Sequence, residues 1–161
     1  MEAKKLPDEG PMIADIVDML GGARVLGRKI REPLEAHDLL IRGLPHEALT
    51  HLVGKYDILR AAGLVEKAIG LSQRTLQRHN QRQKEKHAKP LNQEQSSRIW
   101  KFAEILAKAT MVLGSKDDAE EWLQRPAIGL DSRRPIDLLA TAAGVEIVET
   151  YLDRLEYGVY A

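Results

Sequence analysis

Residues 64–82 decide the fold and read LVEKAIGLSQRTLQRHNQR. Two short helix-forming segments meet there at Gly70, a residue type that adopts left-handed turn conformations without side-chain strain. Leu71 is expected to fill the elbow between them. Ser72 is expected to cap the second helix, because its hydroxyl can accept a backbone N–H that is left free at a helix start. This spacing predicts a helix-turn-helix unit in which Leu76 packs back onto the first helix.

The second helix of this unit presents side chains that suit base edges and phosphates. We expect its DNA-contacting residues to be Ser72, Gln73, Arg74, Thr75, Gln77, Arg78, Gln81 and Arg82. Residues 72–101 carry a net charge of +6, which suits a polyanion because each Lys or Arg placed on a phosphate releases counterions. Glu66 replaces the small residue that is usual at the helix–helix contact, so an unusual crossing or an ordinary helical hairpin stays open.

Helix start and stop residues recur along the whole chain, and no stretch shows the apolar and polar alternation of a strand. We therefore predict an all-α protein. The expected helices cover residues 12–20, 34–41, 46–53, 58–69, 73–82, 92–113, 115–123, 135–143 and 145–157. Gly63 falls inside the fourth of these, and Gly144 is expected to break the chain between the last two. Asn92 and Gln95 have the spacing of a capping box at the start of the longest helix.

Composition excludes several classes of protein. The 161 residues include no Cys, which rules out a disulfide scaffold, thiolate-bound zinc and thiol catalysis. The five His residues show no metal-binding spacing, and no nucleotide loop or nucleophile elbow is present, so we expect no catalytic residues, no metal and no cofactor. No apolar run reaches the length of a membrane span, and the N-terminal residues lack an apolar signal region. The expectation is a cytoplasmic protein without a membrane partner.

The last third of the chain, from residue 115, carries a net charge of −5 and an ordered series of motifs. In order these are Trp122-Leu123 before Pro126, a Gly129-Leu130 turn, Pro135-Ile136-Asp137-Leu138-Leu139-Ala140-Thr141 with Gly144, and Arg154 followed by Tyr157-Gly158-Val159. This series resembles the toxin-binding domain of the Xre/MbcA/ParS antitoxins, which are paired with RES-domain toxins. With Gly43-Leu44-Pro45 and the helix-turn-helix motif, the resemblance extends from about residue 37 to the end.

The resemblance implies an antitoxin that sterically neutralises a cognate RES-domain toxin, an enzyme that consumes NAD, and that represses its own operon by binding operator DNA. It implies three regions: an N-terminal helical extension (1–36), a helix-turn-helix DNA-binding and dimerisation region (37–114) and a toxin-binding region (115–161). Tyr and Arg are enriched at interface hot spots. We therefore expect toxin contacts at the chain end, from Arg154, Glu156, Tyr157, Val159, Tyr160 and Ala161.

A homodimer and a larger complex with the toxin are also expected, because one recognition helix reads too few base pairs for useful specificity. Three alternatives stay open. In the first, the chain is a stand-alone transcriptional regulator without a toxin partner. In the second, it is an interaction module whose helix-turn-helix half is only a dimerisation scaffold. In the third, it is an enzyme whose turnover depends on a titratable residue.

Overall fold

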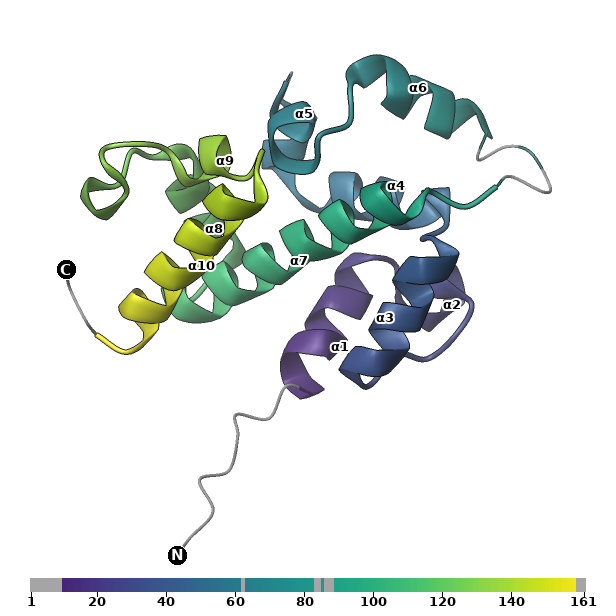
Figure 1. Cartoon of the computed structure of the whole chain (residues 1–161), viewed down its shortest axis with the longest axis horizontal. Helices are drawn as coiled ribbons and strands as arrows, with labels where there is room; N and C mark the ends of the chain where they lie inside the picture. The colour runs from purple at the N-terminus through teal and green to yellow at the C-terminus, as the bar shows by residue number, and fades with distance from the viewer. Residues whose placement is uncertain (1–9, 62, 83–84, 86–88, 159–161) are drawn as a thin grey trace, which may run out of the picture.

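The computed structural model describes residues 10–61, 63–82, 85 and 89–158, and in these residues the chain is all-α (Figure 1). The helices in order are α1 (Gly10–Met19), α2 (Gly22–Leu26), α3 (Pro33–Arg42), α4 (His46–Lys55), the 3-10 turn η1 (Asp57–Arg60), α5 (Leu64–Ile69), α6 (Gln73–Arg82), α7 (Gln93–Leu113), α8 (Lys116–Gln124), the 3-10 turn η2 (Ile128–Leu130), α9 (Pro135–Leu138) and α10 (Ala142–Glu156). None of these helices combines the length and the hydrophobicity that crossing a membrane requires. The predicted fold class is confirmed.

The long helix α7 runs through the middle of the molecule (Figure 1). Its start is the predicted capping box: the Asn92 side chain accepts from the Gln95 backbone N–H at 2.8 Å, and the Gln95 side chain accepts from that of Asn92 at 3.3 Å. Helices α1, α3, α5, α8 and α10 all pack against α7. Ile99, Phe102, Ala103, Leu106 and Ala109 are buried, and Thr110 and Leu113 at the end of the helix are half-buried. Trp100 and Ile105 are buried too, because neighbours cover α7 on more than one side.

The N-terminal helices share this core. Ile16 and Leu20 of the first segment are at most 1% exposed, and α1 packs on both α7 and α4. A short helix that the sequence did not predict, α2, follows between two glycines with positive φ, Gly21 at 100° and Gly27 at 73°. One hydrophobic core contains buried residues from all parts of the described chain, from Ile13 in α1 to Leu152 in α10.

The helix predicted over residues 58–69 is divided in two. The 3-10 turn η1 ends at Arg60, and Gly63, with a φ of 81°, turns the chain immediately before α5 begins at Leu64. A helix tolerates a glycine, but glycine also adopts a left-handed turn without side-chain strain. At Gly63 the chain adopts the turn.

The predicted break at Gly144 is wrong. Helix α9 already ends at Leu138, and α10 starts at Ala142 with Thr141 as its cap, whose hydroxyl accepts from the Gly144 N–H at 3.0 Å. Gly144 lies in the first turn of α10 and is buried. A Cβ on this residue would collide with the Leu138 backbone carbonyl oxygen, so the glycine serves a close approach between α9 and α10.

We expect Gly144→Ala to lower the free energy of unfolding by about 1–3 kcal/mol, because a backbone carbonyl can move aside only by shifting α9. Urea unfolding measures this change. Gly54→Ala is the matched control, since Gly54 lies in α4 with open space around its Cβ position, and it should gain up to about 1 kcal/mol. Equal stability of the two variants would contradict the close approach.

Candidate functional site

The turn between α5 and α6 has the predicted geometry. Gly70 adopts a φ of 75°, and Leu71 is only 4% exposed. The Ser72 hydroxyl accepts from the Thr75 N–H at 3.2 Å and lies 2.9 Å from the Thr75 hydroxyl. Helix α6 therefore starts from a fixed point, with one of its free backbone N–H groups satisfied by the cap.

The close contact at this turn is made by a different residue than the motif led us to expect. A Cβ on Gly70 would collide with the guanidinium of Arg98 on α7, which is itself bonded to Glu94 at 3.0 Å. Glu66 is exposed, so its carboxylate does not lie at a helix–helix contact. Helix α5 packs against α7 and α9, and α6 packs against α4.

Helix α6 presents one polar and cationic face to solvent, and we call these residues the α6 face. They are exposed and recur in pairs at four-residue steps along the helix: Gln73, Arg74, Gln77, Arg78, Gln81 and Arg82. Ser72 and Thr75 are half-buried in the cap. None of the three arginines has an ion-pair partner within the part of the chain that the structure describes. Their charge is therefore available to an external anion.

The opposite side of α6 rests on α4 through two histidines. His79 is 7% exposed and His46 is 6% exposed, and their rings lie 4.5 Å apart between centroids with an angle of 36°. The His46 Nε2 lies 2.5 Å from the Lys89 carbonyl oxygen, whereas neither ring nitrogen of His79 has a hydrogen-bond partner in the described structure. Burial, the neighbouring His46 and the charges of Arg82 and Arg78 lower the pKa of His79.

A second candidate surface lies at the other end of the molecule, where α9 and α10 pack. Asp137, the acidic residue of the Pro135 motif, bonds Arg134 at 2.7 and 3.0 Å and Lys67 of α5 at 3.1 Å. These bonds, chiefly the one from Arg134, lower the pKa of Asp137. The motif carboxylate thus ties α9 to the helix that precedes the turn before α6.

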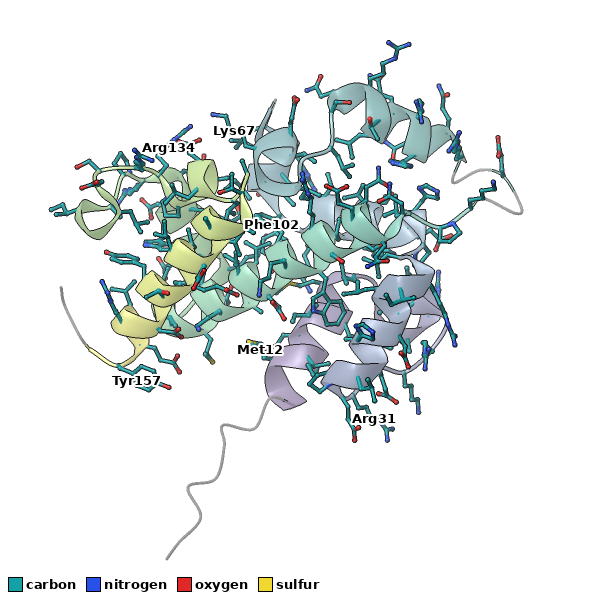
Figure 2. The ribbon with its side chains drawn as sticks, viewed as in Figure 1. Met12, Arg31, Lys67, Phe102, Arg134 and Tyr157 are labelled. Atoms are coloured by element: carbon teal, nitrogen blue, oxygen red, sulfur yellow. The ribbon has the colours of Figure 1, made fainter. Side chains whose placement is uncertain are left out.

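One face of α10 is exposed along its whole length, and we call its residues the α10 face: Ile147, Thr150, Arg154 and Tyr157. Ile147 is 50% exposed and Tyr157 is 73% exposed, values that are high for large apolar side chains. Figure 2 shows Tyr157 at the free end of α10. A groove of about 400 Å³ runs beside this face, lined by Gly129 and Leu130 of the neighbouring loop.

The loop over residues 127–133 holds an apolar side chain in solvent. Ala127 donates to the Arg133 carbonyl at 3.1 Å and accepts from the Ser132 N–H at 3.0 Å, which closes the loop on itself. Asp131 and Ser132 adopt positive φ values of 56° and 57°, a conformation that costs energy in residues other than glycine. Ile128 is 94% exposed in this closed loop. A rigid, exposed apolar residue is a low-cost contact for a partner, because little freedom is lost on binding.

The base of this loop is packed by aromatic rings. The Tyr151 ring lies against Gly129, where a Cβ would collide with it, and stacks on Trp122 with 6.1 Å between centroids. Leu123 is fully buried, whereas Trp122 and its partner Tyr151 are both half-buried.

Of the predicted toxin-contacting residues, Arg154 and Tyr157 belong to the α10 face, and Glu156 is exposed near the same end of α10. Val159, Tyr160 and Ala161 lie outside the described residues. Sequence reasoning missed Ile128 and Ile147. The position of Ile147, seven residues before Arg154, was a usable signal, since that spacing returns to the same helix face. Among the described residues, no three His, Asp or Glu side chains gather to hold a metal.

The end of the chain that carries the α10 face is similar to a known protein domain. Residues 108–158 match the Antitoxin Xre/MbcA/ParS C-terminal toxin-binding domain. This part of the chain is therefore similar to the toxin-binding domain of the Xre/MbcA/ParS antitoxins. The match begins in α7 and ends just beyond α10, so it includes the 127–133 loop and the whole α10 face.

A relative with the same family name extends the similarity towards the N-terminus. The chain is 30% identical to "Antitoxin Xre" of Photorhabdus laumondii over 107 residues, which are 66% of this chain and 64% of the relative. The aligned part of the chain therefore spans less than two thirds of the length of that family member.

We expect acid to weaken the docking of α6 on α4. The folded state favours neutral His79, so as the pH falls below the ordinary histidine value of 6.5 the unfolded chain takes up the proton first and unfolding becomes easier. Urea midpoints at pH 7.5 and pH 5 measure the loss for the unaltered protein and for His79→Gln, which should lose less. His51→Gln, at an exposed histidine of α4, is the control and should match the unaltered protein. An equal acid loss in His79→Gln would contradict the assignment.

Proposed function

We propose that this chain is an antitoxin that binds a RES-domain, NAD-consuming toxin through the α10 face and the 127–133 loop. The observation that carries the proposal is the position of these exposed apolar and aromatic side chains, Ile128, Ile147 and Tyr157, inside the toxin-binding domain match. An interface gains most of its binding free energy from a few apolar and aromatic side chains that lose water on docking. This surface has such residues, with Arg154 among them.

The proposed mechanism is steric. The region from residue 115 carries a net charge of −5, which suits a basic pocket built for the phosphates of a dinucleotide. The antitoxin covers or enters that pocket and keeps NAD out. Catalysis by this chain plays no part in this function.

We further propose that the α6 face binds operator DNA and represses the chain's own operon. The support is the fixed start of α6 and its exposed side chains. Its three arginines have no ion-pair partner among the described residues and suit phosphates, and the glutamines between them suit base edges. The division into 1–36, 37–114 and 115–161 assigns DNA binding and dimerisation to the middle region and toxin binding to the last. A stand-alone regulator would use the α6 face and bind no toxin.

Replacing Ile147 by Glu should raise the dissociation constant for the co-expressed toxin by about tenfold or more, because a charge then enters an apolar contact. Met111→Glu is the matched control, since Met111 is 59% exposed on α7, outside the α10 face. Growth and cellular NAD under toxin expression, with titration of the purified pair, measure the effect. If Ile147→Glu neutralises as well as Met111→Glu does, the toxin binds elsewhere.

Replacing Arg74 and Arg78 by Ala should weaken binding to the promoter fragment and reduce the slope of log affinity against log salt by about 2, because two phosphate contacts are lost. Toxin neutralisation should stay intact. Arg24→Ala with Arg31→Ala removes the same charge from exposed positions outside both proposed binding surfaces and should keep the original slope. An unchanged slope in the α6 variant would overturn the assignment of the recognition helix.

A further inference from the structure

A pocket that neither proposed surface uses lies where α5, α7 and the start of α10 meet. Its volume is about 360 Å³, within the range of about 300–1,000 Å³ that is usual for small-molecule sites. Its wall is built by these three helices and by the loop between α9 and α10. Figure 2 shows Phe102, one of the lining residues, on α7 below α5 and beside the first turn of α10.

The floor of this pocket is apolar. Its residues come from three helices and the loop, and they are Ala68, Phe102, Ile105, Leu139 and Val145. The first four are at most 7% exposed, and Val145 is half-buried. A floor of this kind favours the apolar part of a ligand, because burying that part removes apolar surface from water.

The rim of the pocket carries five charged residues, four of which pair with each other. Arg98 bonds Glu94 at 3.0 Å, and Lys101 bonds Glu149 at 2.7 Å. Burial lowers the pKa of Lys101, but its hydrogen bonds to Glu149 and to a second carboxylate outweigh burial, so the pKa is raised. The ammonium of Lys101 is therefore charged and already has its counter-ions, which leaves it little attraction for an added anion.

Glu146 is the fifth charged residue of the rim. It is exposed on the second turn of α10, and it has no ion-pair partner among residues 10–61, 63–82, 85 and 89–158. Because the other four charges cancel, Glu146 gives the rim an excess of one negative charge. An apolar floor beside one unpaired carboxylate is complementary to a cation that carries an apolar body.

We propose that this pocket binds a small organic ammonium ion, with its charge at the Glu146 carboxylate and an aromatic or branched apolar body on the Phe102 floor. The bound ion contacts α5, α7 and α10 together. Arg98 of the rim also lies against Gly70, at the turn before α6, so the site is placed between the two proposed binding surfaces. A small ligand with one exposed ion pair binds with a dissociation constant of about 1 mM. The proposal concerns this chain alone and does not rest on the proposed antitoxin function.

Titration of the isotope-labelled full chain with phenethylammonium, followed in amide NMR spectra, tests the site. The signals of Ala68, Phe102 and residues 139–145 should shift together and give one dissociation constant. Phenethyl alcohol, which has the same apolar body without the charge, should bind about three- to fivefold more weakly, because an exposed ion pair contributes only modestly. Hydrocinnamate, which places a carboxylate on a similar body, should bind more weakly still.

Variants separate the charge contribution from the apolar one. Glu146→Gln should make the cation bind as weakly as the alcohol and leave the alcohol unchanged, whereas Glu47→Gln, at an exposed carboxylate of α4 outside the pocket, should keep the preference. Ala142→Leu adds bulk at an exposed position of the pocket wall and should weaken both probes. Ala143→Leu is its matched control, since Ala143 is exposed on the same turn but lines the groove beside the α10 face instead.

Glu146 also borders that second groove, so the location of the shifts matters. Shifts confined to the groove around Gly129 and Tyr151 would place the cation there and overturn the proposal. Equal binding of phenethylammonium and phenethyl alcohol, tighter binding of hydrocinnamate, a preference that survives Glu146→Gln, or no binding of the cation at millimolar concentration would overturn it as well.

Discussion

The burial of α7 on several sides at once is the constraint on which the rest of the structure depends. Ile99, Ala103 and Leu106 have no exposed surface, and the helix contacts α1, α3, α5, α8 and α10. Apolar burial of this extent is the main favourable contribution to folding in a chain of this size. The capped start at Asn92 fixes where the helix begins, and so fixes which residues meet each neighbour.

The two proposed binding surfaces are joined through this common helix and through ion pairs between neighbouring helices. Lys67 of α5 reaches Asp137 of α9, and Lys101 of α7 reaches Glu149 of α10 at 2.7 Å. Exposed pairs of this kind contribute little to the free energy of unfolding. Their effect is on orientation. They hold α5, which leads into the turn before α6, and α9, which leads into α10, in a fixed relative orientation. A partner that binds one surface therefore meets a molecule in which the other surface already has a fixed orientation.

The features that sequence reasoning predicted correctly are those set by nearby residues. The capping box at Asn92, the cap at Ser72 and the turn at Gly70 depend on groups at most four positions apart along the chain, so spacing alone reveals them. Gly144 was misjudged because its role depends on the Leu138 carbonyl, which approaches only after the intervening residues turn back. The His46–His79 pair joins two helices far apart in sequence, and no local pattern marks it.

Exposure of apolar residues was the least predictable property, since a helix pattern shows which residues share a face but not whether a neighbour covers that face. Ile128 reads as an ordinary apolar loop residue, and only the closure of residues 127–133 on themselves leaves it in water. The same holds for Leu34 and Ile41, whose face stays open because α3 packs on α7 with its other side. Exposure alone does not assign a contact, since Met111 on α7 is also exposed. The 127–133 loop and α10 are grouped by a second observation, because Ile147 lines the same groove as Gly129 and Leu130.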